Sequence, residues 1–110
     1  MNRSILVPLD GSALAEQALP HAATLARKMG SGLTLARVVT ATTLRGDDPQ
    51  EALRLALAEA ESYLTRTAER LRSEGLDVAV VHDDGEPASV IMAIAHRLPT
   101  ACIVMSTHGR

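Results

Sequence analysis

The sequence contains almost no aromatic side chains and a single cysteine. Phenylalanine and tryptophan are absent, and Tyr63 is the only aromatic residue among 110. Because base stacking needs aromatic side chains, we do not expect the protein to bind single-stranded nucleic acid. Cys102 alone excludes an intrachain disulfide and a paired-cysteine metal site, and its apolar surroundings indicate a small residue of the core.

The sequence also has little excess of charge of either sign. The net charge is −2, acidic and basic residues are interspersed, and Lys28 is the only lysine. No basic stripe is present that would neutralise the phosphates of a nucleic acid, so we expect no nucleic-acid partner. Signal peptides and membrane-length apolar runs are absent as well, which predicts a cytoplasmic protein without a membrane partner. A chain of this length predicts a single domain, residues 1–110.

Short apolar runs alternate with amphipathic helical patterns along the whole chain. This alternation predicts an α/β fold in which an open parallel sheet carries helices on both faces, in three layers. We expect the first strand to be central, between the second and the fourth, with Leu6, Ile103 and Val104 largely buried. The predicted strands are residues 5–9, 33–40, 78–82 and 101–105, and the predicted helices are residues 13–29, 50–73 and a segment that begins at Pro87 and stops before Pro99.

Local signals mark several ends of these elements. Ser12 is a suitable N-cap for the first helix, and Pro20 predicts a kink near residues 16 and 17 because proline lacks an N–H donor. Residues 83–85 predict a turn after the third strand. An apolar stripe on the long helix predicts core packing and not a partner surface; its members are Leu53, Leu57, Ala60, Leu64, Ala68 and Leu71.

Asp10 is the most informative polar residue, since it follows a buried strand at the carboxyl edge of the predicted sheet. Ligands bind at this edge in open α/β folds, although the same carboxylate could simply support the next helix. A hydrolytic trio of Ser12, Asp10 and His108 lacks the motif that would orient the serine. Residues 82–84 (His-Asp-Asp) are more typical of a solvated turn than of a metal site. We therefore expect no catalytic residue, no metal and no enzymatic activity.

Several segments together resemble the universal stress protein (UspA) family. The most specific are residues 5–12 (Ile-Leu-Val-Pro-Leu-Asp-Gly-Ser) and 103–110 (Ile-Val-Met-Ser-Thr-His-Gly-Arg), and residues 18–22, 33–39 and 85–87 support them. The resemblance implies an adenine nucleotide alpha hydrolase-like, flavodoxin-like sheet of order 3-2-1-4-5 and a homodimer. It also leads us to expect that the domain is C-terminally incomplete, with order 3-2-1-4 and the fifth strand missing.

The resemblance further implies an adenine-nucleotide site between the ends of the first and fourth strands. Backbone groups of Val38 would bond the adenine, and the remaining positions would border the nucleoside and the phosphates. The residues carried over by motif are Pro8, Leu9, Asp10, Val38, Met105, Ser106, His108 and Gly109.

The chain departs from the family's phosphate-binding loop at one of these positions. Ser106 stands where the first glycine of the loop is expected, whereas Gly109 matches the second. An added Cβ crowds the backbone path near the phosphates, so we expect ATP or another adenine nucleotide to be bound by the complete protein and only weakly by this chain. The alternative is a dimeric interaction module in stress response that binds no ATP.

Overall fold

The structure, a computed structural model, describes residues 3–40 and 48–106. Four strands form one parallel sheet in the order β3-β2-β1-β4, which confirms the predicted order and the central position of β1. In chain order the elements are β1 (Ser4–Pro8), α1 (Ala13–Glu16), α2 (Ala18–Met29), β2 (Gly32–Val39), α3 (Pro49–Arg72), β3 (Val78–Asp84), α4 (Pro87–Arg97) and β4 (Thr100–Ile103).

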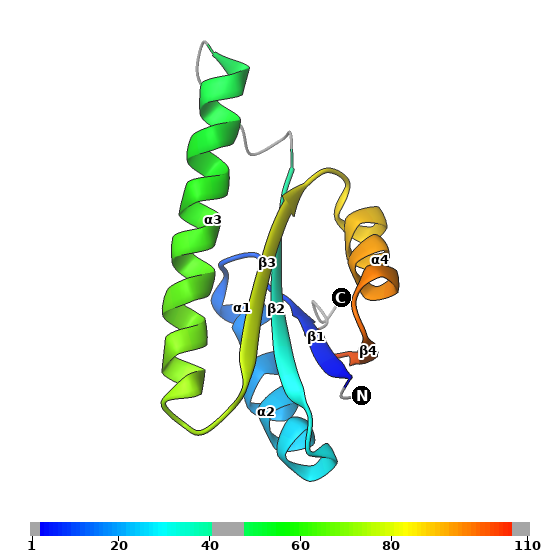
Figure 1. Cartoon of the computed structure of the whole chain (residues 1–110). Helices are drawn as coiled ribbons and strands as arrows, with labels where there is room; N and C mark the ends of the chain where they lie inside the picture. The colour runs from blue at the N-terminus through cyan, green and yellow to red at the C-terminus, as the bar shows by residue number, and fades with distance from the viewer. Residues whose placement is uncertain (1–2, 41–47, 107–110) are drawn as a thin grey trace.

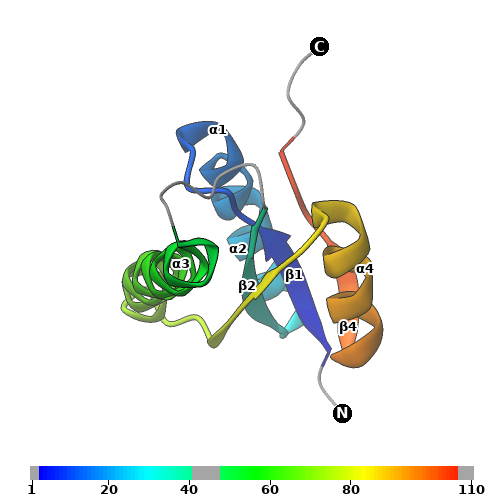
Figure 2. The ribbon, with the colours of Figure 1, turned by 90° about the horizontal axis from the view of Figure 1, so that it is seen from above.

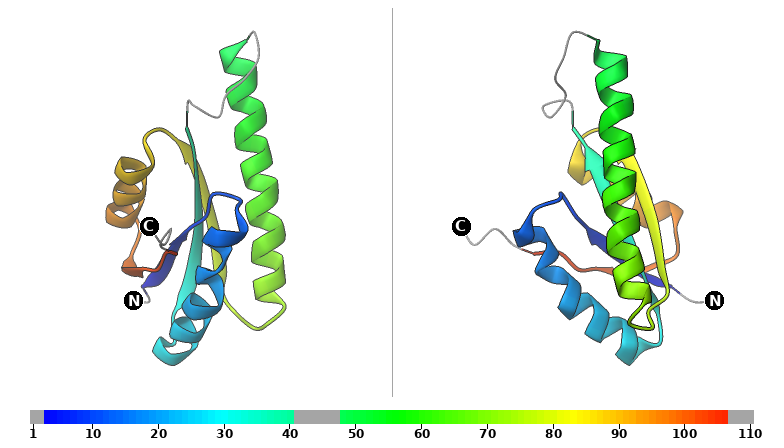
Figure 3. Two further views of the ribbon diagram at one scale, coloured as in Figure 1. Left: turned by 180° about the vertical axis from the view of Figure 1, so that it is seen from behind. Right: turned by 90° about the vertical axis from the view of Figure 1, so that its left-hand side faces the viewer.

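The helices form layers on the two faces of this sheet (Figure 1). Seen from above, α2 and α3 lie on one face and α4 lies on the other (Figure 2). Alternate residues of β1 divide between these layers: Ile5 and Val7 belong to the core beneath α2 and α3, whereas Leu6 packs against Ile94 and its neighbours from α4. The view from behind shows the same separation of α4 from α2 and α3 (Figure 3). The prediction of helices on both faces is confirmed.

The apolar stripe of α3 packs as predicted. Four members of the stripe are buried: Ala60, Leu64, Ala68 and Leu71. The other two, Leu53 and Leu57, are only half-buried. The stripe therefore forms core along the later turns of α3 and approaches solvent near the start of the helix.

The chain between β1 and β2 forms two helices. The break falls at Gln17, whose N–H donates to the Leu14 carbonyl at 3.2 Å, so the predicted kink is a separation of α1 from α2. Pro20 consequently lies in the first turn of α2, where an N–H has no intrahelical partner in any case. The turn before α1 is closed by Ser12, whose Oγ accepts from the Ala15 N–H at 3.1 Å, which confirms the predicted N-cap.

Two strand ends differ from the prediction by two residues, and the other strand boundaries agree with it to within one residue. Asp83 and Asp84 belong to β3 and not to a turn, because they pair with Val38 and Val39 of β2. At the other edge, β4 ends at Ile103, and both Ile103 and Val104 are half-buried. Only Leu6 of the three residues expected to be largely buried is so, because β4 lies at the margin of the four described strands and pairs with β1 alone.

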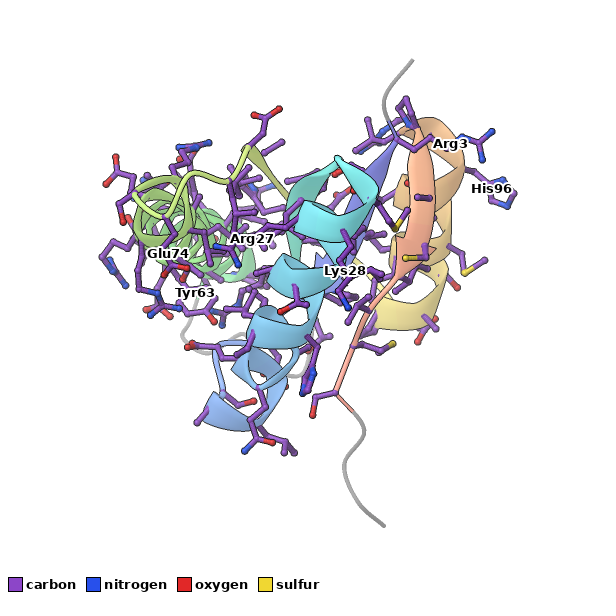
Figure 4. All side chains as sticks on the ribbon, turned by 90° about the horizontal axis from the view of Figure 1, so that it is seen from below. Arg3, Arg27, Lys28, Tyr63, Glu74 and His96 are labelled. Atoms are coloured by element: carbon purple, nitrogen blue, oxygen red, sulfur yellow. The ribbon has the colours of Figure 1, made fainter. Side chains whose placement is uncertain are left out.

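One exposed ion pair lies where the last turn of α2 approaches the chain that follows α3. Figure 4 labels Arg27 on α2 and Glu74 after α3, whose guanidinium and carboxylate lie 3.6 Å apart. Both side chains are about half exposed, with relative areas of 50% and 51%, so this pair contributes little stability. None of the helices within the described residues is long and apolar enough to cross a membrane.

Candidate functional site

A cavity of about 470 Å³ opens at the carboxyl ends of β1 and β2. Open α/β sheets bind ligands at this edge, where the connections of neighbouring strands run to opposite faces of the sheet. Here β1 leads to α1 on one face, whereas β4 follows α4 on the opposite face. Helices from both layers complete the walls. The lining consists of residues 8–10 and 36–40 from the strand ends, Ala15 from α1, Ala56 and Glu59 from α3, Pro87 and Ile91 from α4, and Met105 and Ser106 after β4.

The structure brings six of the eight residues carried over by motif to this one cavity. They are Pro8, Leu9, Asp10, Val38, Met105 and Ser106. The other two, His108 and Gly109, lie outside the described residues. Segments that are about 95 residues apart in the sequence thus meet because β1 and β4 are neighbours in the sheet.

The turn at Asp10 is ordered by its own hydrogen bonds. The Asp10 carboxylate accepts from the Ser12 N–H at 2.9 Å, and Ser12 in turn caps α1. Gly11 between them has φ +87°, a left-handed conformation that disfavours any residue with a Cβ. Asp10 therefore supports the turn and at the same time presents an exposed carboxylate to the cavity.

The backbone of β2 also faces the cavity. The Ala36 carbonyl accepts from the Leu9 N–H at 2.7 Å, so this residue bonds toward β1, whereas the Val39 carbonyl accepts from Gly85 on the β3 side. Alternate residues of a parallel strand bond toward the same neighbour, so Val38 is also directed toward β1. Since β1 ends at Pro8, the chain beside Val38 has already left the sheet.

Two charged residues of this site, Arg37 and Glu59, were missed by the sequence interpretation. Arg37 of β2 lines the cavity, and its guanidinium carbon lies 5.2 Å from the centroid of the Tyr63 ring on α3. The Tyr63 hydroxyl donates to the Glu16 carboxylate at 2.6 Å. A signal was present in the sequence, because Arg37 is the only charged residue in the apolar run 33–39.

The surroundings of Tyr63 disfavour its ionised form. Partial burial is the main cause that raises the pKa of the phenol above its usual range, and the hydrogen bond to Glu16 adds to it. The Arg37 guanidinium acts in the opposite direction and does not offset them. Tyr63 is therefore a neutral donor to Glu16 at physiological pH.

The sequence offered two alternative sites, a metal centre and a hydrolytic trio. No group of three or more histidine, cysteine or acidic side chains in the described part of the chain could hold a metal ion. His82, considered as a ligand, lies in β3 with its Nε2 atom 3.8 Å from the Glu61 carboxylate. His108, the third member of the hydrolytic trio, lies outside the described residues.

Comparisons with known proteins agree on one family. The model of the universal stress protein family matches residues 1–110. A crystal structure of a universal stress protein family member from Burkholderia pseudomallei is 29% identical with a TM-score of 0.82, and the match covers 94% of this chain and 80% of that one. Universal stress protein UspA from Lactobacillus plantarum has a similar fold, with 24% identity, a TM-score of 0.68 and coverage of 97% and 80%. A search of curated proteins found no match.

Proposed function

Because this chain belongs to the universal stress protein family, we propose that it is a stress-response protein whose cavity binds an adenine nucleotide. The cavity carries this proposal: its volume of about 470 Å³ falls within the range of roughly 300–1,000 Å³ that small-molecule sites occupy. Its position, where β1 and β4 diverge, is the expected ligand position of the fold.

The chemistry of the walls suits a nucleoside. Apolar side chains such as Ala36 and Ile91 provide surfaces for a flat base, and the Val38 backbone is directed toward the space that β1 vacates. The Asp10 carboxylate can accept hydrogen bonds from ribose hydroxyls. Binding of this kind needs no catalytic group, and we propose that the protein acts through ligand-dependent association and not through turnover.

Ser106 distinguishes binding of the nucleoside from binding of the phosphates. Its side chain adds a Cβ and a hydroxyl to the cavity wall at the position where the family motif has glycine. We expect ATP to bind this chain more weakly than micromolar, and Ser106→Gly to strengthen ATP binding more than adenosine binding. Equal affinities in the two variants would refute the role of Ser106.

Isothermal titration calorimetry with adenosine, AMP and ATP tests the proposal. Asp10→Asn should weaken adenosine binding about tenfold, because a charged hydrogen bond of about 2.4 kcal/mol becomes a neutral one of about 1 kcal/mol and the loss of about 1.4 kcal/mol is a factor of ten. Asp77→Asn is the matched control, because Asp77 precedes β3 at the opposite end of the sheet. Absence of heat with all three ligands at millimolar concentration would refute nucleotide binding, and sub-micromolar ATP affinity would refute the expected weakness.

Exposed apolar side chains favour a second proposal, self-association. Met105 after β4 and Met92 on α4 have relative exposed areas of 57% and 52%. Within the described residues β4 also pairs on one side only, and such edges readily add a further strand. We propose a homodimer that forms through this edge. Sedimentation at tens of micromolar should show a dimer, and a single monomeric species would refute it.

A further inference from the structure

Arg37 lies between the turn at Asp10 and the long helix. On one side its guanidinium stacks at 5.2 Å over the Tyr63 ring of α3. On the other side it lies so close to Gly11 that a Cβ at that glycine would be 2.9 Å from the Nη1 atom. The side chain therefore fills the space between the turn and α3.

Tyr63 extends this contact to α1. Its hydroxyl donates to Glu16 at 2.6 Å, across 47 residues of sequence, and its ring packs against the core beneath α2 and α3. Figure 4 labels Tyr63 on α3. The turn that carries Asp10 thus lies beside Arg37 and leads into α1, which is hydrogen-bonded through Glu16 to Tyr63 of α3.

The Arg37 guanidinium has no close acidic partner among the described residues. No carboxylate of the described residues lies within ion-pair distance of its guanidinium, although Asp10 and Glu59 line the same cavity. Arg37 is half-buried and belongs to neither buried cluster of the core. A cation here gains from the ring of Tyr63 and can fix the adjacent backbone.

We infer that Arg37 and Tyr63 are positioning residues, which hold the Asp10–Gly11–Ser12 turn in the conformation that presents the Asp10 carboxylate to the cavity. The positioning is a property of the protein without ligand. Its consequence for affinity rests on the proposed function, because there Asp10 bonds the ligand.

Backbone order in the turn is the direct test. We would measure ¹⁵N relaxation of Gly11 and Ser12 in the ligand-free chain, with Leu35 of the buried sheet as internal reference. In Arg37→Gln the order parameters of the turn should fall from about 0.85 toward about 0.6, whereas that of Leu35 should not change. Arg66→Gln, an exposed arginine of α3, is the matched control and should leave the turn unchanged.

Two further variants separate the cation from the general packing. Arg37→Lys keeps a cation and should retain most of the order, whereas Tyr63→Phe keeps the ring but loses the bond to Glu16 and should loosen Ser12 partly. If Arg37→Gln does not fold, these two variants decide. Unchanged order of Ser12 in Tyr63→Phe, or equal loosening of the turn by Arg37→Lys and Arg37→Gln, would overturn the inference.

Adenosine titrations then connect the turn to the ligand. Arg37→Gln should weaken binding about two- to fivefold, the change that loss of a cation–π contact produces. If the turn loosens but the unmodified chain binds no adenosine, the proposed function fails and the positioning role stands. If the unmodified chain binds adenosine and the turn stays ordered in Arg37→Gln, the positioning role fails alone.

Discussion

Replacement of Gly11 by alanine measures how tightly Arg37 is held. Gly11 and Gly75 have nearly the same backbone, with φ of +87° and +92°, but the Cβ of an alanine at Gly75 would meet nothing within 4 Å. The left-handed conformation costs an alanine about 1–2 kcal/mol, and alanine recovers about 0.4–1 kcal/mol through the unfolded state. We therefore expect Gly75→Ala to lower the free energy of unfolding by about 1 kcal/mol.

Gly11→Ala should cost more than this. Its Cβ would lie 2.9 Å from the Arg37 Nη1 atom, so the guanidinium must leave its place between the turn and the Tyr63 ring. Loss of that cation–π contact adds about 0.5–1 kcal/mol at a partly exposed site, for a total of about 1.5–2 kcal/mol. Urea unfolding followed by far-ultraviolet circular dichroism gives both values, provided that the transition is two-state.

The difference between the two glycine variants carries the test. In the Arg37→Gln background the added cost of Gly11→Ala should vanish, because the shorter side chain no longer reaches between the turn and Tyr63. Equal losses of stability for Gly11→Ala and Gly75→Ala in the unmodified chain would show that Arg37 moves freely. The reasoning about a fixed guanidinium would then be wrong.

Two other perturbations test the packing around this site. Since the folded state raises the pKa of Tyr63, the stabilising contribution of the neutral phenol is complete below about pH 10 and is lost as pH rises further. Urea titrations should therefore show that Tyr63→Phe loses less stability than the unmodified chain between pH 8 and about pH 11. Parallel pH profiles of the two proteins would contradict this. Leu64 is fully buried on α3, so Leu64→Ala should lower the free energy of unfolding by about 2–5 kcal/mol. Leu55 is 55% exposed on the same helix, and Leu55→Ala should change that free energy by at most about 0.5 kcal/mol. Similar losses in the two variants would contradict the assigned core face.

The features that the sequence predicts correctly depend on local signals. The N-cap at Ser12 and the helix start at Pro87 require only residues within one turn of each other. The four parallel strands are recognisable because each is a short apolar run followed or preceded by a helical pattern. The strand order does not follow from local signals alone. It was predicted from the resemblance to a known family together with the continuous apolar character of β1.

The errors occur where a neighbouring strand determines the outcome. Asp83 and Asp84 have the composition of a turn, but β2 continues beside them and pairing extends β3 to Asp84. The opposite happens at Ile103, which has the composition of a buried strand residue and remains half-exposed because β4 has one partner in the described sheet. Local composition cannot specify which neighbours a strand has.

The candidate site shows the same limit. A motif could place Asp10 and Met105 at one cavity because each lies at the end of a strand. It could not place Arg37 there, since the contacts of Arg37 are with Gly11, 26 residues earlier in the sequence, and with Tyr63, 26 residues later. Such contacts depend on how far α3 lies from the sheet, and small core residues such as Ala60 and Ala68 set that distance. A larger side chain at either position would move Tyr63 away from Arg37, so the support of the Asp10 turn is a consequence of the alanine-rich core and not of a motif.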